Sequence, residues 1–229
     1  MTETSFFKKN QTLNRVLVGF ICVAVLYTLA TVLMQLRLKN LREQIVWQIS
    51  EQRSLLVAVA ETTARNGADV VTESIIKDCT VLERTEFDDL LGRLDKGLLN
   101  TDIVKLEGLF GRCGSFYAQR KALMVSRLGR EVEVYINQIE QLETLTSSSV
   151  FETYKVDAWK HLVDQENTQS ELFSSLVTQQ DTIISTLMSG TRADSLQMKA
   201  ILKRARETQE SLLATNRQAA DTRATLISL

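Results

Sequence analysis

An uncharged apolar run near the N-terminus is the strongest feature of the hydropathy pattern. Residues 16–36 read VLVGFICVAVLYTLATVLMQL, and Arg15 and Arg37 bound them. At about 1.5 Å per residue, a helix of this length spans roughly 30 Å, the thickness of a bilayer's hydrocarbon core. Backbone polar groups in lipid must bond to one another, so the run should be helical. The pattern predicts a transmembrane helix over residues 16–36, preceded by a short tail over residues 1–15.

Apolar residues beyond this run recur at intervals of three and four, which is typical of one face of a helix. The first such series is Leu38, Leu41, Ile45, Ile49, Leu56 and Val59. The helix is therefore expected to continue out of the membrane as far as Asn66-Gly67, a break signal with a glycine suited to a C-cap. Trp47 is too far from residue 36 for the membrane interface, and we expect it to pack on a neighbouring helix.

Three further long helices are expected over residues 102–146, 150–188 and 192–227. The second begins at a capping-box pattern, Ser149-Val-Phe-Glu152, after a serine-rich interruption. The last carries a heptad-like seam with small and polar members: Ile201, Ala205, Thr208, Leu212, Thr215, Ala219, Thr222 and Leu226. We interpret this seam as the core of an ordinary bundle rather than a cofactor pocket.

These segments predict an all-α fold. The chain has no proline and only nine glycines, so little interrupts its helices. Rods of similar length joined by short turns favour a single N-terminal transmembrane helix that continues into an elongated up-down antiparallel bundle over residues 37–229. Residues 80–112 are left over at the far end. We expect them to form a small helical cap at the distal tip.

The N-terminal run is expected to be an uncleaved anchor rather than a signal peptide. It is longer than the apolar core of a signal peptide, and no small-x-small cleavage site follows it. Basic residues flank it on both sides, Lys8, Lys9 and Arg15 before it and Arg37, Lys39 and Arg42 after it. The positive-inside rule therefore does not decide the orientation.

The cysteines favour one orientation. Cys22 lies within the apolar run, and Cys79 and Cys113 are the only cysteines of the body. The expected cap places both at its base, which predicts a disulfide and hence an oxidising compartment. The alternative is two unrelated buried thiols. We therefore expect a cytoplasmic N-terminal tail and an extracytoplasmic body, as in a bacterial inner-membrane protein that faces the periplasm.

Candidate chemistry is sparse. His161 is the one histidine, and on a helix it is better explained as a partly exposed bundle residue than as a general base. No zinc ligand set accompanies it, and the glycines of GLFGRCG (residues 108–114) lie mid-helix without the strand or Lys-Ser/Thr ending of a phosphate loop. The net charge of −1 argues against nucleic acid. We expect no enzymatic activity, cofactor, metal or small-molecule substrate.

Two groups of charged residues remain as candidates for binding a protein. The first is the expected tip, with Glu83, Glu86, Asp88, Asp89 and Arg93, whose alternative interpretation is a solvated helix face. The second is a locally basic helix, with Arg112, Arg120, Lys121, Arg127 and Arg130. We expect the second group to pair with acidic residues on neighbouring helices at little energy each, the alternative being an acidic partner surface.

The sequence favours a membrane-anchored, non-enzymatic helical stalk or scaffold subunit of a cell-envelope assembly, which binds a protein partner or copies of itself. One alternative is an extracytoplasmic four-helix-bundle sensor, by analogy of fold with ligand-binding bundles of chemoreceptors and kinases. Such a sensor would have to signal through a separate partner protein. The other alternative is a cytoplasmic coiled-coil membrane tether.

Overall fold

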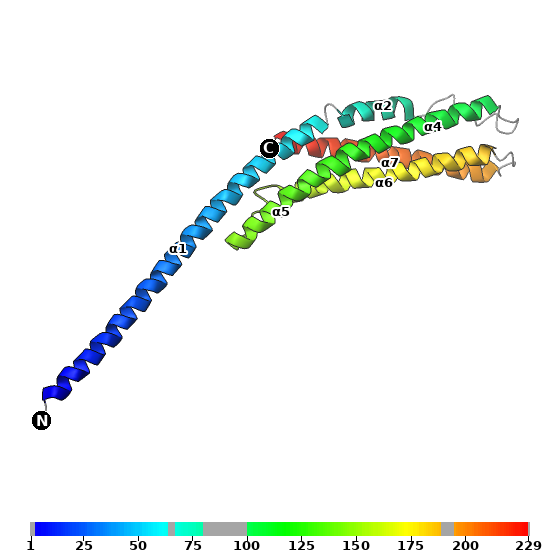
Figure 1. Cartoon of the computed structure of the whole chain (residues 1–229). Coiled ribbons are helices and arrows are strands. Elements are labelled where there is room, and N and C mark those ends of the chain that lie inside the picture. Colours follow the sequence, from blue (N-terminus) through cyan, green and yellow to red (C-terminus); the bar gives the residue numbers. More distant parts are fainter. Residues whose placement is uncertain (1–2, 64–66, 80–99, 189–194, 229) are drawn as a thin grey trace.

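The computed structural model describes residues 3–63, 67–79, 100–188 and 195–228, which form helices and one connecting turn (Figure 1). The elements are α1 Glu3–Thr63, α2 Asp69–Cys79, α4 Asn100–Lys121, the π-helical η4 Ala122–Leu128, α5 Gly129–Thr146, α6 Val156–Met188 and α7 Ser195–Ser228. No strand occurs within these ranges. The predicted all-α class is confirmed.

Helix α1 carries the apolar run and continues without a break into the body of the protein. Its segment Leu17–Thr63 is long and apolar enough to cross a membrane, and no residue of its apolar window is buried inside the protein. Large side chains of the run are open to the surroundings, for example Phe20 (76 % exposed) and Tyr27 (71 %). An apolar surface of this extent is unfavourable in water and needs an apolar environment, and its length suits one crossing of a bilayer.

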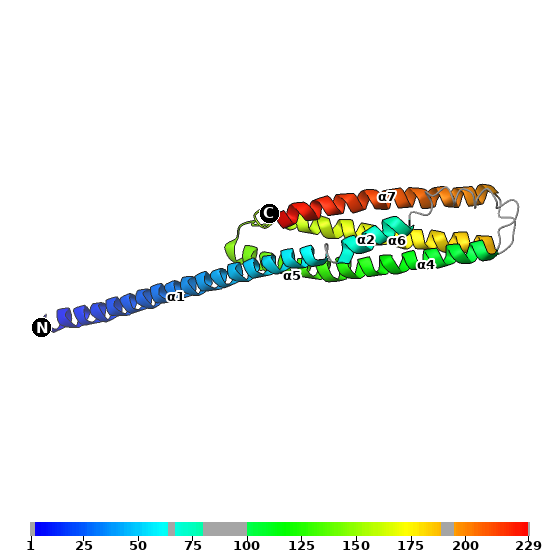
Figure 2. The ribbon, with the colours of Figure 1, turned by 90° about the horizontal axis from the view of Figure 1, so that it is seen from above.

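Helix α5 lies beside the outer part of α1, and α2, α4, α6 and α7 lie side by side and continue beyond the end of α1 (Figures 1 and 2). Helices α6 and α7 pack on each other, α4 packs on α2 and α6, and α5 packs on α1. The chain runs away from the N-terminus in α2 and α6 and back towards it in α4–α5 and α7 (Figure 2). The result is an elongated antiparallel arrangement.

Two clusters of buried side chains fill its interior. The proximal cluster, nearer the apolar run, includes Ile49, Tyr135, Trp159 and Leu162. The distal cluster includes Leu106, Phe110, Cys113, Tyr117, Phe173 and Leu176. Burying side chains of this size supplies about 1.5–3 kcal/mol each, which makes these clusters the main stabilising feature of the body.

The predicted long helix over residues 102–146 is present as one rod formed by α4, η4 and α5. It ends at Thr146, as expected, because Ser147 adopts a left-handed conformation (φ 52°) and its N–H donates to Glu143 O. It begins at Asn100, and Ile103, Leu106 and Phe110 are buried in the body. Residues 100–112 of the expected cap therefore continue a bundle helix. The rest of that segment, residues 80–99, lies outside the described residues.

The predicted start of the next helix at the Ser149–Glu152 capping box is wrong. Helix α6 begins at Val156, after a turn in which Lys155 has a positive φ of 54°. The turn is held by tertiary contacts instead: Val150 N–H donates to a Glu143 carboxylate oxygen at 2.6 Å, and Tyr135 Oη donates to Tyr154 O at 3.1 Å. Side chains of the turn also pack on the proximal cluster. Contacts with other parts of the chain, rather than the local capping box, therefore determine where α6 begins.

The expectation that Trp47 packs on a neighbouring helix is also wrong. Its side chain is 64 % exposed, whereas Ile49, two residues later, is fully buried. Trp47 lies on the opposite side of α1 from the seam that faces α5, because two residues turn a helix by about 200°.

Candidate functional site

The most distinctive site in the described structure is a layer of polar side chains buried in the middle of the body. Arg120 of α4 forms two hydrogen bonds to Glu166 of α6, Nη1 to Oε2 at 2.6 Å and Nη2 to Oε1 at 3.3 Å. Arg120 Nε also donates to Thr72 Oγ1 of α2 at 3.3 Å, and Nη2 donates to Asn216 Oδ1 of α7 at 3.2 Å. One guanidinium thereby joins four helices. We call these four residues the polar layer.

Burial makes the polar layer energetically important. The side chains of Arg120 and Glu166 are only 4 % and 1 % exposed. Two charges buried this deeply are stable only when their hydrogen bonds are well matched, and removal of one partner leaves an uncompensated buried charge. The bidentate geometry also fixes the relative positions of both groups. The layer therefore acts on the alignment of the helices more than on their net stability.

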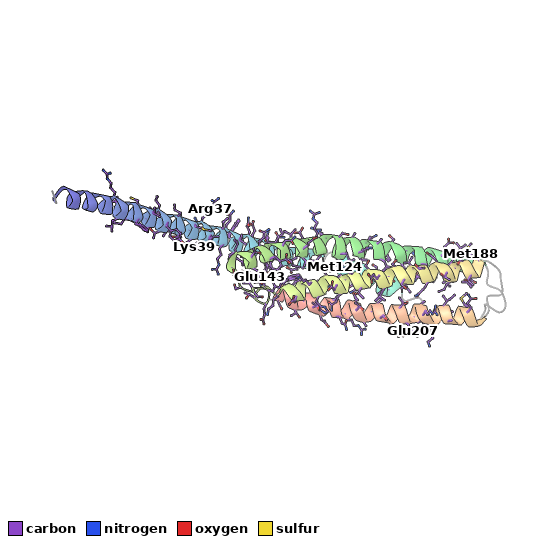
Figure 3. The ribbon with its side chains drawn as sticks, turned by 90° about the horizontal axis from the view of Figure 1, so that it is seen from below. Arg37, Lys39, Met124, Glu143, Met188 and Glu207 are labelled. Atoms are coloured by element: carbon purple, nitrogen blue, oxygen red, sulfur yellow. The ribbon has the colours of Figure 1, made fainter. Side chains whose placement is uncertain are left out.

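A second buried cation lies closer to α1 than the polar layer does. Arg223 of α7 is 7 % exposed, and its Nη2 donates to Asp69 Oδ1 of α2 at 2.9 Å. Its Nη1 lies 4.0 Å from the sulfur of Met124, which Figure 3 places in the middle of the body. Asp69 is half exposed, so this contact is weaker than the buried pair of the polar layer.

Irregular backbone accompanies these contacts. The rod formed by α4 and α5 is π-helical over Ala122–Leu128, which begins two residues after Arg120, and Gly67-Ala68, directly before α2, are π-helical as well. The two irregular segments touch: a Cβ added to Gly67 would lie 2.8 Å from Leu123 Cδ1. The absence of a Cβ at Gly67 leaves room for the Leu123 side chain between the two segments. π-helical turns often mark functional positions in helices.

Glutamines occupy the interface between α6 and α7. Gln169 Nε2 donates to Thr215 O, and Gln179 Nε2 donates to Thr208 Oγ1, both at 3.2 Å. Gln180 and Gln209 are 1 % and 3 % exposed, and neither the amide nitrogen nor the oxygen of either has a hydrogen-bond partner in the structure. A buried amide without partners costs about 1–3 kcal/mol.

Two buried tyrosines resist ionisation. Burial raises the pKa of Tyr117, which stacks on Phe173 with ring centroids 3.7 Å apart. Burial also raises the pKa of Tyr135 from 10.0 to about 12, although Arg53 opposes the shift and Tyr154 adds to it. Both side chains stay neutral near pH 7, so neither supplies a phenolate base or nucleophile.

The residues predicted to flank the membrane all lie on α1. Arg15, Arg37, Lys39 and Arg42 are exposed, and Lys39 makes only a 3.9 Å contact with Glu43 one turn away. Lys8 and Lys9 lie on the first turns of α1. The candidate tip residues Glu83, Glu86, Asp88, Asp89 and Arg93 lie outside the described residues, so that prediction stays a prediction.

The body cysteines lie on the facing helices α2 and α4. Cys79 is the last residue of α2, and Cys113 is fully buried in α4. In the antiparallel pair, Thr72 is opposite Arg120. Cys79 follows Thr72 by one heptad, and Cys113 precedes Arg120 by one heptad, so both cysteines belong to the same level of the helix pair.

His161 lies exposed on α6, with its Nε2 atom 3.1 Å from Gln165 Nε2. Of the basic residues on the α4–α5 rod, Arg120 does pair with an acidic residue on a neighbouring helix, but in the interior rather than at the surface. The small energy predicted for this pair is therefore too low. A signal was present, because Arg120 continues the seam of Cys113 and Tyr117 at spacings of three and four.

The fold defines a class: an all-α protein with one candidate membrane-spanning helix that runs directly into a bundle cross-linked by buried polar groups. Within the described residues, no group of three or more histidine, cysteine, aspartate or glutamate side chains is placed to hold a metal ion. Comparison with protein-family models, curated proteins and solved structures finds no match.

Proposed function

We propose that this chain is a membrane-anchored, non-enzymatic helical stalk or scaffold subunit of a cell-envelope assembly, which binds a protein partner through its body or distal tip. The observation that carries the proposal is the continuity of α1. One helix holds both the uncovered apolar run and the seam that packs into the body, so no flexible linker separates anchor and bundle. A rigid connection of this kind suits a stalk that holds its far end at a fixed distance from the membrane.

Membrane extraction tests the anchor. The full chain is expected to stay with membranes at alkaline pH and to be released by detergent. The variant V25R/L29R should lose this behaviour, because each charge near the helix centre costs about 2.5–3.5 kcal/mol of insertion. The matched control T178R/T182R places the same charges on exposed positions of α6 and should behave as the unmodified protein. Release of the unmodified protein without detergent would refute the anchor.

We place the N-terminal tail in the cytoplasm and the body outside it, with a disulfide between Cys79 and Cys113. The shared level of the two residues on α2 and α4 supports the bridge, as does the state of the thiols: Cys22 is free and Cys113 is not. A bridge across this loop would add about 4 kcal/mol on the chain-entropy model. Mass spectrometry with and without reductant tests the bridge, and a compartment-specific reporter fused after Leu229 tests the topology. A cytoplasmic reporter signal would favour the tether alternative.

Partner binding at the tip needs a test that leaves the bundle intact. Residues 100–112 pack in the distal cluster, so only side-chain charges should be changed. The tip variant is E83Q/E86Q/D88N/D89N/R93Q. The control is E171Q/D181N/K203Q/E207Q/E210Q, which removes the same charges from exposed positions of α6 and α7. Loss of in-cell cross-links to a given protein in the tip variant alone supports the tip, and equal cross-linking in both variants excludes it.

One observation favours the sensor alternative. Gln180 and Gln209 present buried amides that could satisfy a small, neutral, hydrogen-bonding ligand between α6 and α7. In the stalk interpretation, Q180L/Q209L removes unpartnered polar groups and should leave the unfolding temperature unchanged or raise it. In the sensor interpretation, small polar compounds raise the unfolding temperature of the unmodified chain and fail to do so in Q180L/Q209L.

A further inference from the structure

The register between α1 and α5 fixes the height of the α5–α6 turn above the membrane. Gln52 Nε2 of α1 donates to Glu131 Oε2 of α5 at 3.1 Å, which aligns the two antiparallel helices. Arg37 precedes Gln52 along α1 by as many residues as Thr146 follows Glu131 along α5. The end of α5 is therefore level with Arg37, the first residue after the apolar run.

Packing places the turn at the same end of the body. Ile45 of α1 and Val150, Phe151 and Tyr154 of the turn each pack against the proximal cluster. Figure 3 shows Glu143, in the last turn of α5, at the same end of the body as Arg37 and Lys39, with Met188 at the opposite end. The end of α5 and the start of the turn are thus the part of the body nearest to the apolar run.

The depth of the lipid head-group layer can be compared with this geometry. That layer extends roughly 5–8 Å beyond the hydrocarbon core on each side. Helices packed at about 10 Å and tilted by about 20° differ in height by about 3 Å, which is less than the layer is deep. The tilt of α1 therefore does not remove the turn from the layer.

We propose that the end of α5 and the first residues of the α5–α6 turn, residues 147–149, lie in the head-group layer of the bilayer that α1 spans. The inference rests on the proposed membrane anchor. Ser147, Ser148 and Ser149 are exposed at the end of α5, and their hydroxyls can hydrogen-bond to phosphate and ester oxygens of lipid. Leu145, 39 % exposed, adds an apolar side chain beside them. The exposed charges of the turn, Glu152 and Lys155, are opposite in sign, so the contact needs no anionic lipid.

The contact would make a second attachment of the body to the membrane surface beside α1. Two attachment points restrict the angle between the rod and the bilayer, which one helix alone leaves free. Helix α6 has 33 residues. It would then carry the far end of the body about 50 Å from the turn.

Site-specific fluorescence in phosphatidylcholine nanodiscs tests the proposal on the full chain. An environment-sensitive fluorescent amino acid replaces Ser149 or Thr153 in the turn, Thr182 far along α6, or Cys22 inside the apolar run, one position at a time. All three body positions are exposed. Head-group nitroxide lipid should remove most of the fluorescence at residue 149, less at residue 153 and little at residue 182. Replacing part of the phosphatidylcholine with phosphatidylglycerol should not change this pattern.

The label at residue 22 separates two kinds of failure. Acyl-chain nitroxide lipid should quench it strongly if α1 spans the bilayer. Quenching at residue 22 with none at residues 149 and 153 would overturn the turn proposal and leave the anchor standing. Absence of quenching at residue 22 would refute the anchor, and the turn proposal with it. Equal head-group quenching at residues 149 and 182 would show a body lying flat and would also overturn the proposal.

Discussion

Removal of one charge from the polar layer is the perturbation with the largest effect expected in this protein outside the membrane. R120M keeps a long unbranched side chain but removes every donor that Arg120 directs at Glu166, Thr72 and Asn216. Glu166 then remains with a side chain that is 1 % exposed and with no cation beside it. E166M is the reciprocal change and leaves the guanidinium buried without its counter-ion.

The size of the expected loss in unfolding free energy follows from the burial of the Arg120–Glu166 pair. Breaking a buried pair by removing one partner costs about 3–5 kcal/mol, whereas replacing both partners by apolar side chains of similar volume is often neutral or stabilising. Each single variant should therefore unfold about 3–5 kcal/mol more easily. The double variant R120M/E166M should be more stable than either single variant. The difference gives a coupling free energy of several kcal/mol.

Urea unfolding in detergent, followed by helical circular dichroism, measures these free energies. The matched control is K203M/E207M with its two single variants. Lys203 and Glu207 form a pair at 3.8 Å on α7, with side chains 79 % and 60 % exposed. Exposed pairs of this kind contribute about 0.3–0.5 kcal/mol, so all three control variants should unfold nearly as the unmodified chain does.

Two results would refute this reasoning. Single variants R120M and E166M that cost no more than the exposed control would mean that the layer is not closed to water. A double variant whose cost equals the sum of the two singles would mean that the pair is not coupled. In either case the polar layer would not set the alignment of the helices.

Three further predictions concern single positions. The pKa of Tyr135 is about 12 in the folded chain and 10.0 in the unfolded chain, so the native state holds the phenol proton more tightly. The stability that Tyr135 contributes in this way is complete below pH 10 and is lost as the pH rises to about 12. The unfolding free energy of Y135F should therefore depend less on pH over that range. Trp159 is 2 % exposed and Trp47 is 64 % exposed, so W159A should cost about 3–5 kcal/mol and W47A less than about 0.5 kcal/mol in urea unfolding; similar costs would contradict the exposed position of Trp47. G67A would bring its Cβ to 2.8 Å from Leu123 Cδ1, the end of a flexible side chain that can turn aside, so we expect a cost below about 1 kcal/mol in urea unfolding, and a larger cost would show that Leu123 is held in place.

Sequence periodicity predicted the long helices correctly, because one misleading residue changes little in a pattern that repeats over many helical turns. The end of the long helix at Thr146 and the seam positions Ala205, Leu212, Ala219 and Leu226 on α7 follow directly from spacing. Their burial depends on which face of a helix they occupy, and the periodicity of three and four encodes that face.

The errors on α7 have one physical cause. The sequence suggested Ile201, Thr208, Thr215 and Thr222 as the other half of the seam. These residues are half-buried, and Ile201 packs against the distal cluster, whereas the buried residues are Leu202, Gln209 and Arg223. The buried positions lie one residue later, and two of them are glutamine and arginine, which are rarely buried. Their burial depends on partners in other helices, such as Asp69 for Arg223, and no local pattern reveals those partners.

The buried polar groups explain how a bundle with so many small and polar core residues can have one arrangement. Long antiparallel helices with heptad-like seams can shift past one another by seven residues at little cost in apolar packing. Such a shift of α6 would place Arg120 opposite Trp159 or Phe173 in place of Glu166. The unpaired buried charge would cost about 3–5 kcal/mol, a large part of the stability of a typical domain. The polar layer therefore disfavours shifted alignments, and because α1 is continuous from the apolar run to the seam, one alignment of the helices gives one distance between the apolar run and the far end of the body.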